Sequence, residues 1–128
     1  MSFASDLTTF AKKAERNIET VKQTAARDLV NDVIDDTPQD SGYAAANWQS
    51  GDASGPVDRT SVAAAKAEAL GAIARWQGGD RPLVFANAAP YIFALEFGDS
   101  KHDPAGMVFK NVKRWPSYVR TAARSVHR

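Results

Sequence analysis

The chain has 128 residues, of which 44% are hydrophobic, and a formal net charge of +1. This length is typical of one domain, and we expect a single core that buries roughly two-thirds of the unfolded surface. The chain has no cysteine, which excludes disulfides, thiolate metal sites and a cysteine nucleophile. It has neither a secretory-type start nor ~20 consecutive apolar residues, so we expect a soluble protein made in the cytoplasm, without membrane contact.

The charge is divided unevenly along the chain. Residues 1–99 contain 9 Lys or Arg and 14 Asp or Glu, whereas residues 100–128 contain 7 Lys or Arg and one Asp. The body is therefore acidic and the C-terminal segment basic. This asymmetry points to a polyanion or an acidic protein surface as the partner of that segment.

Apolar residues recur at helical spacing over residues 3–35. They are Phe3, Leu7, Phe10, Ala14, Ile18, Val21, Ala25, Leu29 and Val33. Steps of three or four predict one helix of about 30 residues, near 45 Å at ~1.5 Å per residue. Such a helix either lies across a sheet or uses its excess length to contact neighbouring subunits, and both interpretations stay open here.

Four acidic residues lie close to the C-terminal end of this helix: Asp28, Asp32, Asp35 and Asp36. The helix dipole disfavours negative charge there. We expect the basic C-terminal segment to offset them, within a subunit or between subunits. The alternative is a solvated acidic face or an earlier helix end.

The middle of the chain predicts a small sheet and one helix. Asp40-Ser41-Gly42 has turn composition, and a strand is expected over 44–50 with Trp48 in the core. A helix is expected over 58–76, capped by Asp58 or Thr60. A second short strand is expected over 82–86, parallel or antiparallel to the first.

The last third predicts two helices. Pro90 suits the first turn of a short helix that ends at Gly98. A further helix is expected from about residue 116 to 128, where Arg120, Arg124 and Arg128 form one stripe at steps of four. Contact with DNA phosphates and pairing with the acidic body are both open interpretations of this stripe.

These elements predict an α+β fold in a single domain of residues 1–128. A small, mainly antiparallel sheet would be flanked by the long N-terminal helix, the middle helix and the C-terminal helix. The α+β core would span residues 37–108.

No pattern of enzyme chemistry is present in the sequence. Glu96 is expected to make a salt bridge or a hydrogen bond to a turn. His102, between Asp99 and Asp103, fits no zinc spacing and is interpreted as an exposed loop residue. Gly-rich phosphate loops and nucleophile motifs are missing, so we expect no catalytic residue, no cofactor and no metal.

Two short segments resemble a known family. The first is Pro38-Gln39-Asp40-Ser41-Gly42 followed by Trp48, and the second is Asn87-Ala88-Ala89-Pro90-Tyr91 followed by Leu95-Glu96-Phe97-Gly98. Their order and spacing resemble the neck and tail-completion proteins of tailed bacteriophages, where Thr is usual in place of Ser41. The resemblance covers roughly residues 37–108. Residues 101–107 stand in place of the family's commoner Pro-rich segment.

The resemblance implies a structural virion protein, localised to the neck or tail top, that acts in tail completion and head-to-tail joining. Its partners would be the tail terminator, tail tube or connector proteins and further copies of itself, with non-specific contact to passing DNA. The motif residues with an implied structural role are Asp40, Gly42, Trp48, Asn87, Pro90, Tyr91, Glu96 and Gly98.

Two exposed segments are the candidate contact sites. A docking loop is expected at Asp99, Lys101, His102 and Asp103. The residues expected to meet DNA or an acidic partner are Lys110, Lys113, Arg114, Arg120, Arg124 and Arg128. The alternative function is a small nucleic-acid-binding protein that uses this basic C-terminal helix.

Overall fold

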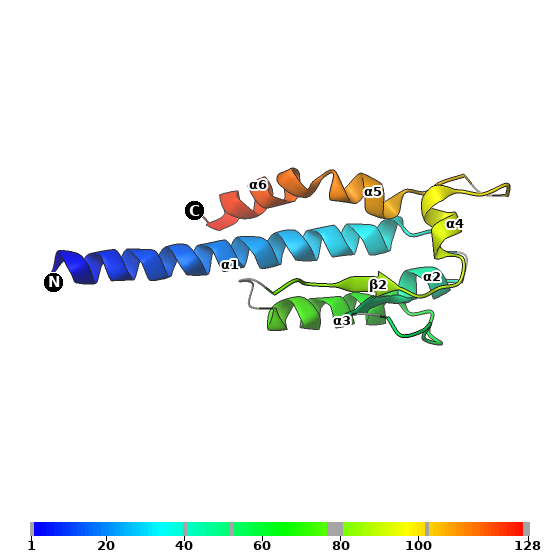
Figure 1. Ribbon diagram of the computed structural model, residues 1–128, viewed down its shortest axis with the longest axis horizontal. Helices are drawn as coiled ribbons and strands as arrows, with labels where there is room; N and C mark the ends of the chain where they lie inside the picture. The colour runs from blue at the N-terminus through cyan, green and yellow to red at the C-terminus, as the bar shows by residue number, and fades with distance from the viewer. Residues whose placement is uncertain (1, 40, 52, 77–80, 102, 127–128) are drawn as a thin grey trace.

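The computed structural model describes residues 2–39, 41–51, 53–76, 81–101 and 103–126. The elements in chain order are α1 (Phe3–Asp36), α2 (Tyr43–Ala46), β1 (Trp48–Ser50), α3 (Val62–Arg75), β2 (Phe85–Asn87), α4 (Ile92–Phe97), α5 (Met107–Val112) and α6 (Trp115–Val126). Helix α1 runs between α5 and α6 on one side and the layer of α3 and the strands on the other (Figure 1). The α+β fold expected from the sequence is confirmed.

Helix α1 is a single helix of 34 residues with a defined start and end. The Ser2 hydroxyl accepts a hydrogen bond from the Ser5 amide at 3.2 Å, and the Thr37 hydroxyl at the other end donates to the Val33 carbonyl at 2.7 Å. Only the C-terminal half is packed. Residues 2–10 are exposed and project beyond the rest of the molecule (Figure 1).

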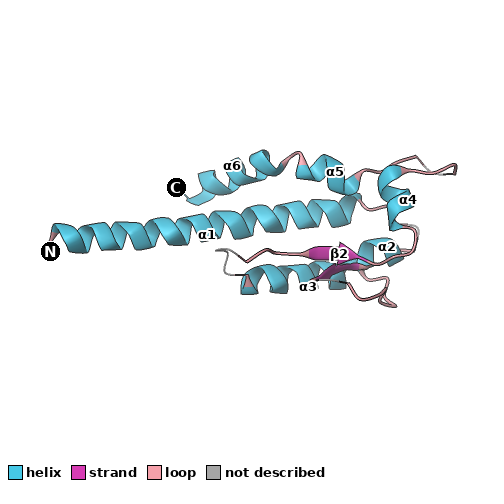
Figure 2. Ribbon diagram, viewed as in Figure 1, coloured by secondary structure: helices cyan, strands magenta, loops and turns pink. Residues whose placement is uncertain are grey.

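The sheet consists of two short antiparallel strands in the described residues (Figure 2). Trp48 pairs with Asn87 and Ser50 pairs with Phe85. The predicted strand over 44–50 is wrong in its first half, because Tyr43–Ala46 forms α2. Three consecutive buried alanines have high helix propensity and lack the alternation of a strand with one exposed face.

Helix α3 begins later than the sequence predicts. Ser61, rather than Asp58 or Thr60, is its N-cap, and the Ser61 hydroxyl accepts from the Ala64 amide at 3.1 Å. The preceding residues do not continue the helix, because Arg59 is engaged with the ends of α2 and β1. Strand β2 covers Phe85–Asn87 instead of 82–86, since the pairing with β1 sets its bounds.

The C-terminal third contains one more helix than expected. Pro90 precedes α4 instead of opening it, and Tyr91 is the N-cap residue. Helix α5 was not predicted, and its start depends on a contact with α4 described below. Helix α6 begins at Trp115, so that Pro116 falls in its first turn, where proline is tolerated.

The core is built mainly from small residues between α1 and its neighbours. On one side Ala25 of α1 packs against Tyr118 and Ala122 of α6. On the other side Ala65, Ala69 and Ile73 of α3 are buried. Alanine allows close approach of helices, but each alanine buries little apolar surface and so contributes little stability by burial. No described helix is both long and apolar enough to span a membrane.

Candidate assembly interface

The corner between α4 and α5 is fixed by Glu96. Its carboxylate accepts hydrogen bonds from the amides of Val108 at 3.0 Å and Phe109 at 2.9 Å, in the first turn of α5. The Glu96 carbonyl also accepts from the Gly106 amide at 3.1 Å. A carboxylate at a helix N-terminus satisfies amides that have no partner within the helix and complements the dipole. Glu96 therefore both begins α5 and holds it against α4.

This corner presents aromatic side chains to solvent. Phe93 and Phe97 are 74% and 71% exposed, with ring centroids 6.3 Å apart and planes within 13° of parallel. Phe109 on α5 is 63% exposed, and the Lys113 ammonium lies 4.1 Å from its ring centroid. We call Phe93, Phe97 and Phe109 the aromatic patch. Clustered exposed aromatics of this kind are typical of a surface that a partner covers.

The two segments that carry the family resemblance meet in space. The Asn87 side-chain amide donates to the Ala44 carbonyl at 2.8 Å, and the rings of Tyr43 and Tyr91 lie 6.3 Å apart. Trp48 is half-buried, and its indole N–H donates to the Thr37 hydroxyl at 2.9 Å. These contacts tie the end of α1, the start of the sheet and the approach to α4 into one scaffold.

Two motif glycines adopt positive φ. Gly42 has φ 84°, and a Cβ there would lie 2.5 Å from the Thr60 carbonyl oxygen, so only glycine fits without a shift of the backbone. Gly98 has φ 81° and ends α4, its amide donating to the Ala94 carbonyl at 2.8 Å. Gly42 allows the chain to pass close beneath residue 60 and enter α2.

A network of hydrogen bonds and one ion pair near β1, formed by Arg59 and Glu68, was not predicted from the sequence. Arg59 donates to the Ala46 carbonyl at 2.6 Å and the Trp48 carbonyl at 3.1 Å, and its guanidinium pairs with Glu68 at 3.1 Å. The Ser50 amide donates to Glu68 at 2.6 Å. Partial burial acts to raise the pKa of Glu68, but the Ser50 hydrogen bond and Arg59 outweigh it and lower the pKa below its ordinary value. No local pattern marks these two residues as partners.

The acidic end of α1 is paired with several basic side chains. Lys110 lies 3.7 Å from the Asp36 carboxylate, Arg114 lies 3.4 Å from that of Asp32, and Lys66 of α3 pairs with Asp35. Within a subunit, the C-terminal segment thus offsets part of the acidic cluster.

Tyr118 strengthens the same junction from α6. Its hydroxyl donates to the Asp32 carboxylate at 2.6 Å, and the nearby buried Asn111 donates to Asp36 at 2.8 Å. Burial, followed by the hydrogen bond to Asp32, raises the pKa of Tyr118 to about 12. The junction therefore binds α5 and α6 to the end of α1.

The described arginines of α6 are not part of this junction. Arg120 and Arg124 are exposed on α6, and neither has an ion pair within residues 2–126 as far as these are described. In the expected docking loop, the Lys101 amide donates to the Asp99 carboxylate at 2.9 Å, and Asp103 is exposed. The predictions for Asp40, His102 and Arg128 concern positions outside the described residues.

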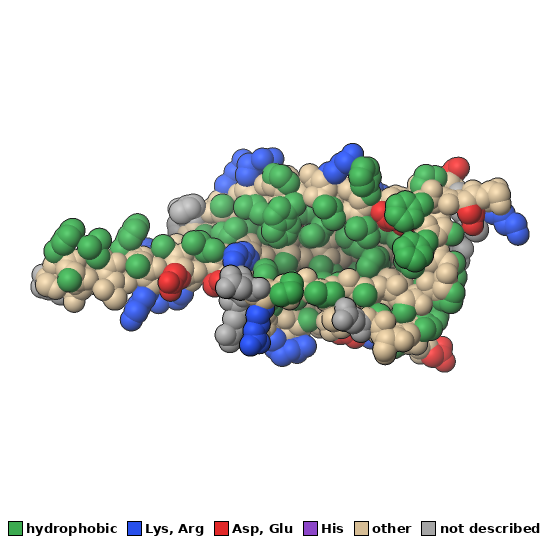
Figure 3. All heavy atoms as spheres, in the orientation of Figure 1, with side chains coloured by type: hydrophobic (Ala, Val, Ile, Leu, Met, Phe, Trp, Pro, Cys, Tyr) green, Lys and Arg blue, Asp and Glu red, His purple; other side chains and the backbone are tan. Residues whose placement is uncertain are grey.

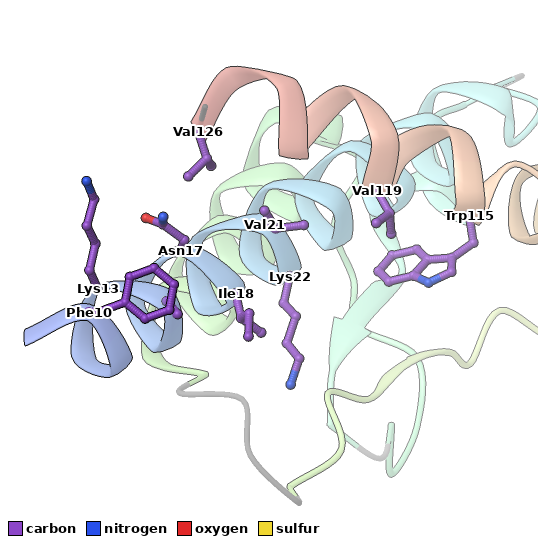
Figure 4. A pocket seen from close by; sticks show the side chains of 10 residues that line it. Phe10, Lys13, Asn17, Ile18, Val21, Lys22, Trp115, Val119 and Val126 are labelled. Carbon is purple, nitrogen blue, oxygen red and sulfur yellow. The ribbon is translucent and has the colours of Figure 1, made fainter. Parts of the chain in front are cut away.

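A groove of about 710 Å³ runs between α1 and α6. Its lining residues are Phe10, Lys13, Ala14, Asn17, Ile18, Val21 and Lys22 of α1 and Trp115, Val119 and Val126 of α6 (Figure 4). The lining is mainly apolar. We call this the α1–α6 groove.

These surfaces define an α+β protein with exposed aromatic and apolar faces on a hydrogen-bonded scaffold. Across the described residues, no group of three or more His, Asp or Glu side chains is placed to hold a metal ion. Comparisons with protein-family models, with curated proteins and with solved structures found no match.

Proposed function

We propose that the protein is a structural component of a tailed-bacteriophage particle, located at the neck or tail top, where it acts in tail completion and head-to-tail joining. The observation that carries the proposal is the aromatic patch. It lies on and beside the segment that resembles neck proteins, and the motif residue Glu96 fixes its geometry through the Val108 and Phe109 amides. The motif thus builds a surface, which is what a joining protein needs.

The energetics of the patch favour a partner protein. Burying an exposed phenylalanine is worth roughly 1.5–3 kcal/mol. Phe93 and Phe97 stack on α4 and Phe109 is exposed on the adjoining α5, and exposed aromatic side chains are the type that dominates protein interfaces. Because the corner is already hydrogen-bonded, little ordering entropy is lost when a partner covers it.

The expected docking loop extends the same surface. Residues 99–101 and 103 follow α4 directly, at the end of the molecule opposite the projecting start of α1 (Figure 1). A partner seated on the aromatic patch would therefore also meet Asp99 and Lys101. The candidate partners are the tail terminator, tail tube or connector proteins, and the protein would reside in the virion after synthesis in the host cytoplasm.

The test is deletion of the gene from the phage or prophage that carries it, followed by complementation and electron microscopy of the lysate. We expect filled heads beside free tails in the deletion. Wild-type protein and the control Leu70→Ser/Val84→Ser, which removes exposed apolar side chains elsewhere, should restore joined particles. Phe93→Ser/Phe97→Ser should not, although its circular dichroism stays that of the wild type.

Normal infectious particles from the deletion would overturn the neck role. Joined particles from the Phe93→Ser/Phe97→Ser variant would remove the aromatic patch from it. Tails of abnormal length would move the assignment from joining to length termination.

Arg120 and Arg124 favour a second candidate function, a small nucleic-acid-binding protein. They are exposed one helical turn apart on α6 and are free of ion pairs in the described structure. Each neutralised phosphate adds about 0.9 to the salt slope of binding, so these two arginines would contribute only about two units to it.

A further inference from the structure

The first part of α1 has an apolar stripe that the described residues of the subunit leave exposed. Phe3, Leu7 and Phe10 are 79%, 52% and 71% exposed, and Ala14 continues the stripe toward the body. We call residues 3–14 the overhang. Figure 3 shows it as a narrow projection with hydrophobic side chains along one edge.

The spacing of the stripe indicates what covers it. Steps of four, three and four residues repeat the pattern of the inner positions of a coiled coil, whose partner is another helix. Further along α1 the same stripe continues through Val21 and Ala25, where α6 of the same subunit packs on it. The overhang lacks such a helix, although its sequence pattern is unchanged.

We propose that the overhang pairs with the overhang of a second copy of this chain, antiparallel and about a two-fold axis. In one register the inner residues match by size. Leu7 lies opposite the partner's Phe10, and Phe3 lies opposite the partner's Ala14, so each large ring faces a smaller side chain. The two-fold axis repeats both layers, which makes the interface self-complementary.

Charge supports the antiparallel orientation. Asp6 and Lys13 lie on the same flank of the stripe, one before Leu7 and the other before Ala14. In the register above, Asp6 faces the partner's Lys13, and the symmetry gives this pair twice. A parallel pair would instead set identical residues at the same level and lose both attractions.

In this dimer the end of the α1–α6 groove would contact the partner's overhang. Ala14 lines the groove together with Ile18 and Val126. The partner's Phe3, opposite Ala14, therefore reaches the end of the groove. The second copy would extend the packing that α6 provides along the rest of α1.

The inference does not rest on the proposed neck role, because self-association is measured on the purified protein alone. Sedimentation equilibrium of the wild type should show a monomer–dimer equilibrium. Leu7→Asp should weaken dimerisation about 10-fold or more, because it sets a charge against an aromatic ring. Thr9→Asp adds the same charge to the same exposed helix outside the stripe and should leave the dimer unchanged.

A charge exchange tests the flanking pair. Asp6→Lys alone should weaken dimerisation, and Asp6→Lys/Lys13→Asp should restore it. Both positions are exposed, so helicity by circular dichroism serves as the folding control.

Orientation is tested by disulfide formation, since the chain has no cysteine of its own. A mixture of the Phe3→Cys and Ala14→Cys variants should give the mixed disulfide under mild oxidation. Each variant alone should give little, because like positions would lie about 16 Å apart along the helices. Disulfides within each single variant, a wild type that stays monomeric at high concentration, or a dimer insensitive to Leu7→Asp would each overturn the proposal.

Discussion

Replacement of Gly42 by alanine tests the scaffold most directly. The residue has φ 84°, and the added Cβ would lie 2.5 Å from the Thr60 carbonyl oxygen, an approach that real Cβ atoms essentially never make. The left-handed backbone costs about 1–2 kcal/mol for a non-glycine residue. Relieving the contact adds roughly 1–3 kcal/mol, offset by about 0.5 kcal/mol from the stiffer unfolded chain. The expected loss of stability is therefore about 1.5–4.5 kcal/mol.

Two other glycines provide matched controls. Gly51 has φ 77° but a Cβ there would meet nothing within 4 Å, so Gly51→Ala should cost only the backbone term, about 1 kcal/mol. Gly55 has neither feature, and Gly55→Ala should be close to neutral. The difference between the Gly42 and Gly51 variants isolates the contact with Thr60.

The measurement is urea unfolding followed by circular dichroism, with thermal unfolding in parallel. For a chain of this length about 4 °C is lost per kcal/mol, so Gly42→Ala should lower Tm by roughly 10 °C. A Gly42→Ala protein as stable as Gly51→Ala would refute the reasoning. It would show that the backbone around Gly42 and Thr60 shifts to accommodate the added Cβ at little cost in stability.

The remaining predictions concern the other contacts. Tyr118→Phe should lose about 1.5–3 kcal/mol at neutral pH, because the hydroxyl donates to the charged Asp32. The pKa of Tyr118 is about 12 in the folded protein against an ordinary 10.0, so the hydroxyl stabilises the fold fully below pH 10.0 and this contribution is lost as the pH rises toward 12. Between pH 10 and 12 the free energy of unfolding should therefore decrease more steeply for the wild type than for Tyr118→Phe. Glu96→Ala should lose about 1–2 kcal/mol and speed amide exchange in the first turn of α5, whereas unchanged exchange there would contradict the capping role. Arg120→Gln/Arg124→Gln should reduce the salt slope of any DNA binding by about two, and an unchanged slope would exclude these residues from the contact.

The helical framework could be predicted from the sequence because its signals are local. The apolar period places α1 within one residue of its observed bounds, and Gly98 marks the end of α4. The strand predicted at 44–50 was wrong in its first half, because three small alanines follow their helix propensity, whereas Trp48 begins the pairing with β2. Helix α2 ends at Ala46 and strand pairing begins at Trp48, and a sequence window that spans both averages the helix signal with the strand signal.

The exposed surfaces and the polar networks were harder to predict from the sequence, because they depend on contacts between residues far apart in the chain. Helix α5 begins where Glu96, twelve residues before Val108, supplies the cap. The pairing of Arg59 with Glu68 and of Tyr118 with Asp32 follows from the packing of α3 and α6. A residue such as Phe93 also looks like a core residue in sequence, and only the fold places it on the outside.

The overhang makes the stability of α1 uneven along its length. An isolated helical segment of about 12 residues is marginal in water, and residues 3–13 are exposed in the described structure. The backbone amides of α1 should therefore exchange with solvent quickly near Phe3 and slowly near Val33, a gradient along one continuous helix. Any partner that covers the stripe would flatten this gradient, so the rigid length of α1 would be set by the assembly state of the protein.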